Sequence, residues 1–238
     1  MEHRDHDMVT AEATARQNPV SPPEGLPRDR ITALKVFAAH PSPQLIALAL
    51  AAALITRAVI AEFSWVDAAI ALAVWAYFPV NEWLIHVFML HYTPRKIFGR
   101  TLDFHLPKTH RWHHGEPWKL EWVFIPRHIH LLVFPVIAVL VVLAGNWRGP
   151  LLSGMTIYLL LGLHYEWVHY LAHIHWCPNN AYYRRRVQEH RWHHFRNENY
   201  WWGVSMGLGD RLFKTAPTVG EVEKTGTTGT LRGNGRTL

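Results

Sequence analysis

Four long apolar stretches constrain the fold of this 238-residue chain more than any other feature of its sequence. They lie at residues 43–61, 66–90, 129–147 and 151–172. Each is long enough to cross a bilayer, because a helix needs about 20 residues to span a hydrocarbon core about 30 Å thick. We therefore predict an all-α, multi-pass membrane protein with four transmembrane helices, in a membrane domain comprising residues 43–216.

Buried helices of a soluble protein are the alternative explanation for such stretches. Several tryptophans, Trp65 and Trp147 among them, lie near the ends of the stretches. Tryptophan is enriched where transmembrane helices meet the membrane–water interface. This placement favours a membrane protein over a soluble one.

The two ends of the chain differ from the apolar stretches in composition. Residues 1–42 are polar and contain five prolines, and residues 217–238 are rich in Gly and Thr. Such segments seldom bury enough apolar surface to fold. We predict a flexible tail at each end, and no cleavable signal peptide, because no apolar segment opens the chain.

The positions of the cationic residues predict how the helices are oriented. Of the 24 Lys and Arg residues, 22 lie in residues 1–42, 92–127 and 174–238. Four crossings place these segments on one side of the membrane, and the positive-inside rule makes that side cytoplasmic. The connections on the other side, at residues 62–65 and 148–150, are short. We therefore predict two antiparallel hairpins, with both termini and a His-rich helical cap on the cytoplasmic side.

Several cationic residues call for separate predictions. We expect Arg57, near the end of the first apolar stretch, to extend its side chain to the membrane surface. We expect the run at residues 184–186 to contribute membrane-surface charge, which attracts anionic lipid headgroups. The net charge of +6 does not indicate a nucleic-acid partner, because the basic residues follow the membrane boundaries and no nucleic-acid-binding motif is present.

Histidine is the most unusual residue type in the chain. There are 18, and ten of them form four groups: two pairs at the ends of the second and fourth apolar stretches, each followed by the pentapeptide His-Arg-Trp-His-His. The two pentapeptides lie 80 residues apart, so each half of the chain repeats one plan. The ten residues are His86, His91, His110, His113, His114, His169, His173, His190, His193 and His194.

The spacing of these histidines predicts metal binding. Residues three and four apart share one face of a helix, as His190, His193 and His194 do. Neutral imidazole binds Fe, Zn, Cu and Ni, and ten convergent imidazoles are too many for one ion. We predict two metal ions with nitrogen ligands. The single cysteine, Cys177, excludes a zinc site built on thiolates, and we expect it to be structural.

Two carboxylates precede the histidine pairs. Glu82 lies one turn before His86, and Glu166 lies three residues before His169. We expect both to orient ligand imidazoles through the second ring nitrogen, with direct metal ligation as the alternative. Polar groups at membrane depth are costly and indicate function.

The four histidine motifs resemble those of the fatty acid hydroxylase superfamily, also called the sterol desaturase-like family. The resemblance covers about residues 75–215. The neighbourhoods at residues 164–170 and 199–215 are similar to the fatty acid and ceramide 2-hydroxylase branch. Carotenoid hydroxylases share the style of the motifs, and acyl desaturases have fewer of them. The pair His169 and His173 favours the hydroxylase pattern.

The resemblance implies a di-iron centre that activates O2 and inserts one oxygen atom into a C–H bond of a lipid acyl chain. Zinc can replace iron in a purified sample, because imidazole sites bind whichever metal is available. Some family members carry a fused cytochrome b5 domain. No such domain and no GxGxxG motif is recognisable here, so we expect electrons from a separate ferredoxin, cytochrome or reductase.

Other functions remain alternatives to fatty acyl hydroxylation. Within enzymes these are hydroxylation of sterols or carotenoids and desaturation of a lipid. A membrane metal-binding or transport protein is the non-enzyme alternative, although transporters hold their sites near the midplane and these ligands lie at one face. A metalloprotease is disfavoured because the sequence lacks the HExxH motif.

Overall fold

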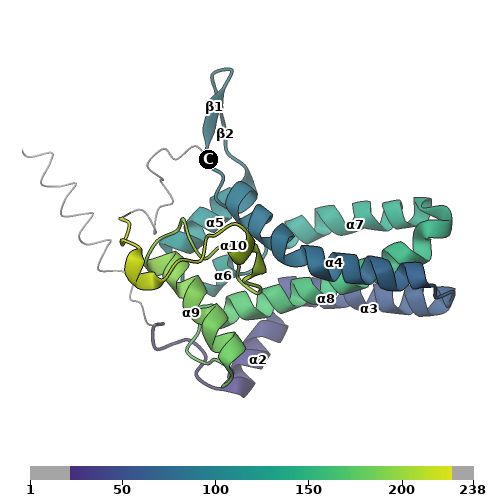
Figure 1. Cartoon of the computed structure of the whole chain (residues 1–238), viewed down its shortest axis with the longest axis horizontal. Helices are drawn as coiled ribbons and strands as arrows, with labels where there is room; N and C mark the ends of the chain where they lie inside the picture. The colour runs from purple at the N-terminus through teal and green to yellow at the C-terminus, as the bar shows by residue number, and fades with distance from the viewer. Residues whose placement is uncertain (1–21, 227–238) are drawn as a thin grey trace, which may run out of the picture.

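The computed structural model describes residues 22–226, so half or more of each predicted tail, at residues 1–21 and 227–238, lies outside the described residues. Four long helices form an elongated arm, and shorter helices form a cap at one end of it (Figure 1). The arm comprises α3 (Pro41–Ile60), α4 (Trp65–Leu84), α7 (Arg127–Leu143) and α8 (Arg148–Ala172). The cap comprises α5 (His105–Gly115), α6 (Leu120–Val123), α9 (Ala181–Phe195) and α10 (Leu208–Leu212).

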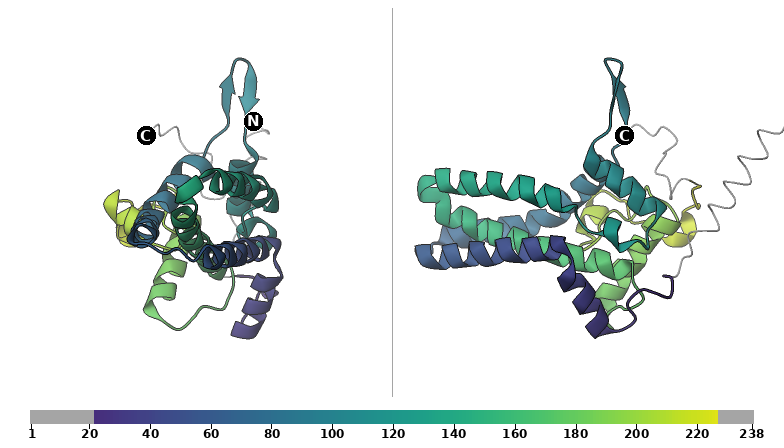
Figure 2. Two further views of the ribbon diagram at one scale, coloured as in Figure 1. Left: turned by 90° about the vertical axis from the view of Figure 1, so that its right-hand side faces the viewer. Right: turned by 180° about the vertical axis from the view of Figure 1, so that it is seen from behind.

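The helices of the arm run side by side, as the end-on and reverse views show (Figure 2). α8 packs against both α3 and α4. Gly154 lets α8 approach α4 closely, because a Cβ atom there would lie 2.7 Å from Cγ2 of Ile70. Ile46, Ala53, Leu152 and Leu159 form the buried apolar core between α3 and α8.

Three helices among the described residues are long and apolar enough to cross a membrane: Pro41–Ile60, Trp65–Leu90 and Leu120–Leu143. Large apolar side chains of α7, such as Leu132, Val136 and Leu140, are exposed on its outer surface. Continuous apolar exposure of this kind suits contact with lipid rather than water. The predicted fourth span, α8, is not one of the three, and its second half carries His164, Glu166 and His169.

The observed position of the Arg57 side chain differs from the predicted one. Its side chain does not extend to the surface but is buried in the last turn of α3. The connection from α3 to α4 lies at the end of the arm away from the cap (Figure 1). The guanidinium group pairs with Asp67 at 2.6 Å and also donates to Ser153 Oγ at 2.9 Å. The short connection between α3 and α4 places Asp67 in the first turn of α4, where its carboxylate also accepts from the backbone N–H of Ser64. A buried partner therefore replaces the predicted contact with the membrane surface.

The run of three arginines is also only partly at the surface. Arg184 and Arg185 are exposed, but Arg186 is buried in the cap. Arg186 pairs with the buried carboxylate of Glu189 and donates to the carbonyl of Gly203 at 3.4 Å. The prediction of surface charge was wrong for Arg186, because its side chain points from α9 toward the segment that follows that helix.

The structure differs from the predicted N-terminal tail at residues 30–39, which form helix α2 (Arg30–Ala39). Asp29 caps this helix by accepting a hydrogen bond from the backbone N–H of Thr32. Ala33 is fully buried in an apolar cluster with Phe124 and Tyr170. The polar composition of residues 1–42 as a whole hides this short apolar helix.

The remaining elements are short. The π-helix η1 (Ile85–Leu90) continues α4, and a β-hairpin of β1 (Arg95–Ile97) and β2 (Arg100–Leu102) extends from the cap (Figure 1). The hairpin turns at Phe98 and Gly99, which both have positive φ angles (48° and 74°). Two 3-10 turns complete the described chain, η2 (Gly145–Trp147) and η3 (Val219–Glu221).

Candidate metal centre

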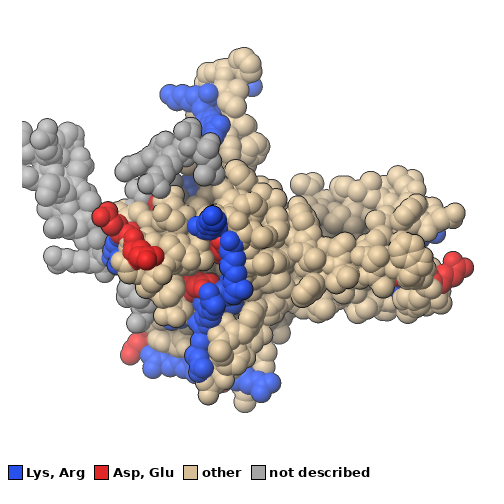
Figure 3. All heavy atoms as spheres, in the orientation of Figure 1, with Lys and Arg blue, Asp and Glu red and all other residues tan. Residues whose placement is uncertain are grey.

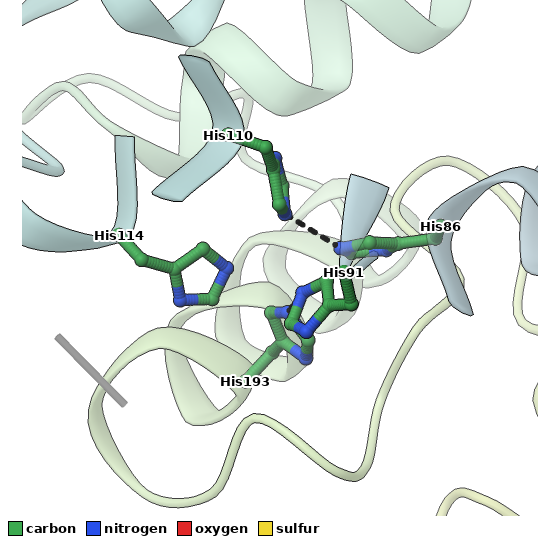
Figure 4. A group of neighbouring side chains, drawn as sticks. All are labelled: His86, His91, His110, His114 and His193. Carbon is green, nitrogen blue, oxygen red and sulfur yellow. Dashed lines mark hydrogen bonds between the residues drawn. The ribbon is translucent and has the colours of Figure 1, made fainter. Parts of the chain in front are cut away.

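The ten predicted histidines converge inside the cap in two groups of five. Within each group, one ring nitrogen of every residue lies within 4.8 Å of those of the other four. Cluster A comprises His86, His91, His110, His114 and His193 (Figure 4). Cluster B comprises His113, His169, His173, His190 and His194. All ten are buried except His91, which is half-buried.

A local change of helix type positions the first pair, His86 and His91. Residues five apart do not face the same direction on an α-helix. Here the helix ends as the π-helix η1, and the backbone N–H of His91 donates to the carbonyl of His86 at 3.1 Å. This bond between residues five apart brings both imidazoles to the same side. The second pair, His169 and His173, needs no such change because α8 remains α-helical up to Ala172.

The two His-Arg-Trp-His-His motifs form parts of α5 and α9, and each divides its histidines between the clusters. On α5, His110 and His114 enter cluster A, whereas His113 enters cluster B. On α9, His190 and His194 belong to cluster B, whereas the middle histidine, His193, belongs to cluster A. At 3.6 residues per turn, residues four apart diverge by about 40°, while the residue at i+3 lies about 60° to the other side. Each half of the chain therefore supplies four ligands to one cluster and one to the other.

The distances within the clusters fit metal coordination. Neighbouring Nε2 atoms lie 3.0 to 3.3 Å apart in both clusters. Two nitrogen ligands at right angles, each about 2.1 Å from a metal ion, would lie about 3 Å apart. All-nitrogen donors of this kind suit first-row transition metals. The residues present thus fit the metal site that the sequence predicts.

The electrostatics of the cap keep these imidazoles neutral. Burial, reinforced by neighbouring imidazoles, lowers the pKa of five histidines of α5 and α9 well below the usual value of 6.5. These are His110, His113, His190, His193 and His194. A neutral imidazole offers a lone pair to a metal ion, whereas an imidazolium offers none. Both clusters are therefore ready to bind metal at neutral pH.

Backbone carbonyls hold the second nitrogen of two cluster A ligands. His86 Nδ1 donates to the carbonyl of Trp202 at 2.6 Å, and His193 Nδ1 donates to that of Tyr200 at 2.8 Å. These bonds direct the Nε2 atoms toward the centre of the cluster. The sequence could not reveal them, because no side-chain pattern marks a carbonyl that serves this purpose.

Asp210 fixes the segment that provides these carbonyls. Its carboxylate accepts hydrogen bonds from the backbone N–H groups of Trp202 and Gly203 at 2.9 and 2.7 Å, and from Thr215 Oγ1 at 2.7 Å. Burial raises the pKa of Asp210, and these three hydrogen bonds oppose that effect. Asp210 is a positioning residue that the sequence interpretation did not single out, although it lies within the stretch resembling the 2-hydroxylase branch.

The two predicted carboxylates have different partners from those expected. Glu82 accepts from the backbone N–H and the hydroxyl of Ser205 at 2.5 and 2.8 Å. Glu166 accepts from Ser42 Oγ at 2.6 Å and from the backbone N–H of Ile125 at 3.0 Å. Among the described residues, neither carboxylate receives a hydrogen bond from a cluster histidine, and neither belongs to a cluster. Both carboxylates instead connect segments of the chain. Glu82 joins α4 to the segment that follows Trp202, and Glu166 joins α8 to α3 and to Ile125.

Replacing Asp210 by Ala is expected to lower the metal affinity of cluster A at least about tenfold, the usual effect of losing support around a ligand. The reason is that the segment at residues 200–203 loses its anchor. Asp103→Ala is the matched control, because Asp103 is also in the cap but pairs with Arg111 at the surface. Metal content measured after dialysis against a weak chelator checks this, and equal retention in both variants would contradict the role of Asp210.

Comparison with known proteins places this geometry in a family. Residues 71–215 match the sequence model of the fatty acid hydroxylase family. The chain belongs to this family. The matched region includes all ten histidines of clusters A and B, so the fatty acid hydroxylase domain contains the whole candidate metal centre.

Two curated proteins from Arabidopsis thaliana are similar to this chain. Dihydroceramide fatty acyl 2-hydroxylase FAH1 is 28% identical over 148 residues, and dihydroceramide fatty acyl 2-hydroxylase FAH2 is 29% identical over 140 residues. The matches cover 61% and 58% of this chain, and 58% and 56% of the relatives. The chain thus spans little more than half the length of these relatives. No solved structure gives a significant match.

Proposed function

We propose that this protein is an O2-dependent membrane hydroxylase that inserts one oxygen atom into a C–H bond of a lipid acyl chain. The observation that carries the proposal is the convergence of ten imidazoles, in two groups of five, at the end of apolar helices. Membership of the fatty acid hydroxylase family supports the same reaction. Such a reaction needs an oxidising centre next to an apolar chain and shielded from water.

In this proposal each cluster holds one iron ion, and the chemistry that the two bound ions supply is the activation of O2. The chain's own residues orient the ligands and exclude water. The indole ring of Trp202 packs on cluster A, with centroids 5.2 Å from His86 and 4.5 Å from His91. Trp118 packs near cluster B, 6.1 Å from His173.

The balanced reaction consumes the substrate, O2, two electrons and two protons, and it yields the hydroxylated lipid and water. The electrons come from a separate donor, for which we propose a ferredoxin, a cytochrome or a reductase. Both relatives are named as dihydroceramide fatty acyl 2-hydroxylases, which supports an acyl chain as the substrate here.

We further propose four membrane spans in two hairpins, with α8 as the fourth, and with the cap and both termini on the cytoplasmic side. Supporting this, α8 runs beside three helices apolar enough to span a bilayer (Figure 2). The face of the arm seen in Figure 3 is uncharged except at its far tip, whereas Lys and Arg gather on the cap. Residues 1–42, 92–127 and 174–238, which four crossings would put on one side of the membrane, hold 22 of the 24 cationic residues, and this supports a cytoplasmic cap.

Cells that produce the protein are expected to contain a hydroxylated acyl lipid that is missing from cells without it. When the cells receive isotopically labelled O2, mass spectrometry of the lipids should find one labelled oxygen atom in the product. A lipid product that has lost two hydrogen atoms instead would indicate a desaturase. A hydroxylated sterol or carotenoid would mean that the substrate is not an acyl chain. Readily exchanged metal without any oxidised lipid would contradict the enzyme and favour a metal-binding or transport protein.

A further inference from the structure

A groove of about 330 Å³ lies where α4 meets α9 and α10, and it is separate from both metal clusters. Trp75 and Pro79 of α4 form one wall. The other walls come from α9, through Tyr182 and Arg185, and from α10, through Arg211. None of the ten cluster histidines lines it.

The cationic side chains of this groove have unused hydrogen-bonding capacity. Arg211 forms no side-chain hydrogen bond or ion pair with the described part of the chain. Arg185 uses only Nε, which donates to Glu189 at 2.7 Å, and its side chain is 58% exposed. The third arginine, Arg186, is buried, and it is already paired with the other carboxylate oxygen of Glu189. With Glu189 as the one acidic partner of the two α9 arginines, the groove keeps an excess of positive charge.

The groove lies at the boundary between the cap and the arm. In Figure 3 the Lys and Arg side chains form a stripe over the cap, next to the uncharged arm. α4 belongs to a helix apolar enough to cross a membrane. Trp75 and Leu208 are 55% and 44% exposed, respectively, and offer an apolar surface beside the guanidinium groups. A ligand that fits must therefore combine an anionic group with an apolar chain.

We propose that this groove binds the phosphate headgroup of an anionic membrane phospholipid. The fixed fork of a guanidinium group matches the oxygens of a phosphate and can donate two hydrogen bonds to it. Arg185 and Arg211 hold the phosphate, while an acyl chain lies along Trp75 and Leu208. An acidic protein partner would also meet the charge, but a wall formed by a membrane-spanning helix favours a lipid.

Binding of phosphatidylglycerol by the full-length protein in detergent tests this proposal, with native mass spectrometry counting the retained lipids and phosphatidylcholine as the reference lipid. Each arginine near a membrane surface strengthens anionic lipid binding roughly fivefold. Arg185→Gln combined with Arg211→Gln is therefore expected to reduce phosphatidylglycerol retention roughly 25-fold and to leave phosphatidylcholine unchanged.

Arg184→Gln is the matched control, because Arg184 is exposed on the same helix, donates to Asn179, and does not line the groove. Replacing Arg185 and Arg211 by Lys keeps both charges and should preserve most of the binding. If the double glutamine variant does not fold, Arg211→Gln alone carries the test, since its side chain is exposed and unpaired in the described chain.

Unchanged phosphatidylglycerol retention in the groove variants would overturn the proposal, as would an equal loss of retention in the Arg184→Gln control. Displacement of the lipid by inorganic phosphate at equal concentration would also overturn it. So would groove variants that lose binding to an acidic electron donor but keep the lipid. Lipid retention and metal content are separate measurements, so this proposal can fail while the proposed hydroxylase function stands, and the reverse also holds.

Discussion

Replacing His193 by Ala is expected to abolish lipid hydroxylation while the protein still inserts into the membrane, and His113→Ala is expected to do the same. Each variant removes one of the five imidazoles of a cluster. Even groups that only support a metal ligand lower affinity or activity by about 10- to 100-fold when lost, so the loss of a ligand should exceed that range. Hydroxylated lipid per amount of membrane-inserted protein is the measurement.

His105→Ala provides the control for these variants. His105 lies on α5 like His113, but it is exposed and belongs to neither cluster. It should keep both activity and metal content. Full activity in His113→Ala or His193→Ala would contradict the assignment of two metal ions to these histidines.

Because His113 and His193 each belong to the cluster formed mainly by the other half of the chain, double variants can test which histidines share a metal ion. If cluster A holds one ion, His193→Ala combined with His91→Ala removes two ligands of the same cluster and should leave the cluster B ion in place. His193→Ala combined with His113→Ala affects both clusters and should release both ions. If each half of the chain instead held its own ion, His193 and His91 would belong to different sites, and their double variant would lose both.

The ten histidines that converge in clusters A and B are the ten that the sequence pattern singled out, because side-chain type and spacing can be read directly from the sequence. Their division between two clusters was not predicted, because the spacing of His190, His193 and His194 places all three on one side of a helix without showing which other histidines each one meets. Which neighbour each imidazole meets depends on how α5 and α9 pack together. The five-residue spacing of His86 and His91 fits an α-helix poorly, and the π-helix η1 accommodates it.

The structure differed from the sequence predictions where partners come from distant segments. Asp67 lies ten residues after Arg57, on the next helix, so the sequence could not show that the two side chains meet. The carbonyl of Trp202 was invisible for another reason, because any residue can supply a carbonyl. Helix α2 was missed because its short apolar stretch lies within a segment that is polar and rich in proline as a whole. These features depend on how distant segments pack together, which cannot be read from local composition.

Replacing Arg57 by Met is expected to destabilise the arm without disturbing the clusters. The carboxylate of Asp67 would remain buried without the guanidinium that now donates to it at 2.6 and 3.0 Å. Breaking a buried ion pair on one side is strongly destabilising because one charge is left uncompensated. The ring of Phe63, 3.7 Å from the Arg57 guanidinium carbon, would lose a cation–π contact as well. A melting temperature lower by roughly 10 °C in detergent is expected for a chain of this size.

The double variant Arg57→Met with Asp67→Leu separates the charge from the packing. It removes both charges and fills the site with apolar side chains, which is often neutral or even stabilising. Its melting temperature should therefore lie well above that of Arg57→Met alone. Because the pair lies where α4 begins, and His86 and His91 lie beyond its other end, the metal content per folded chain should match the wild type in both variants. Equal melting temperatures for the single and double variants would mean that packing around Arg57, and not its ion pair, holds the far end of the arm together.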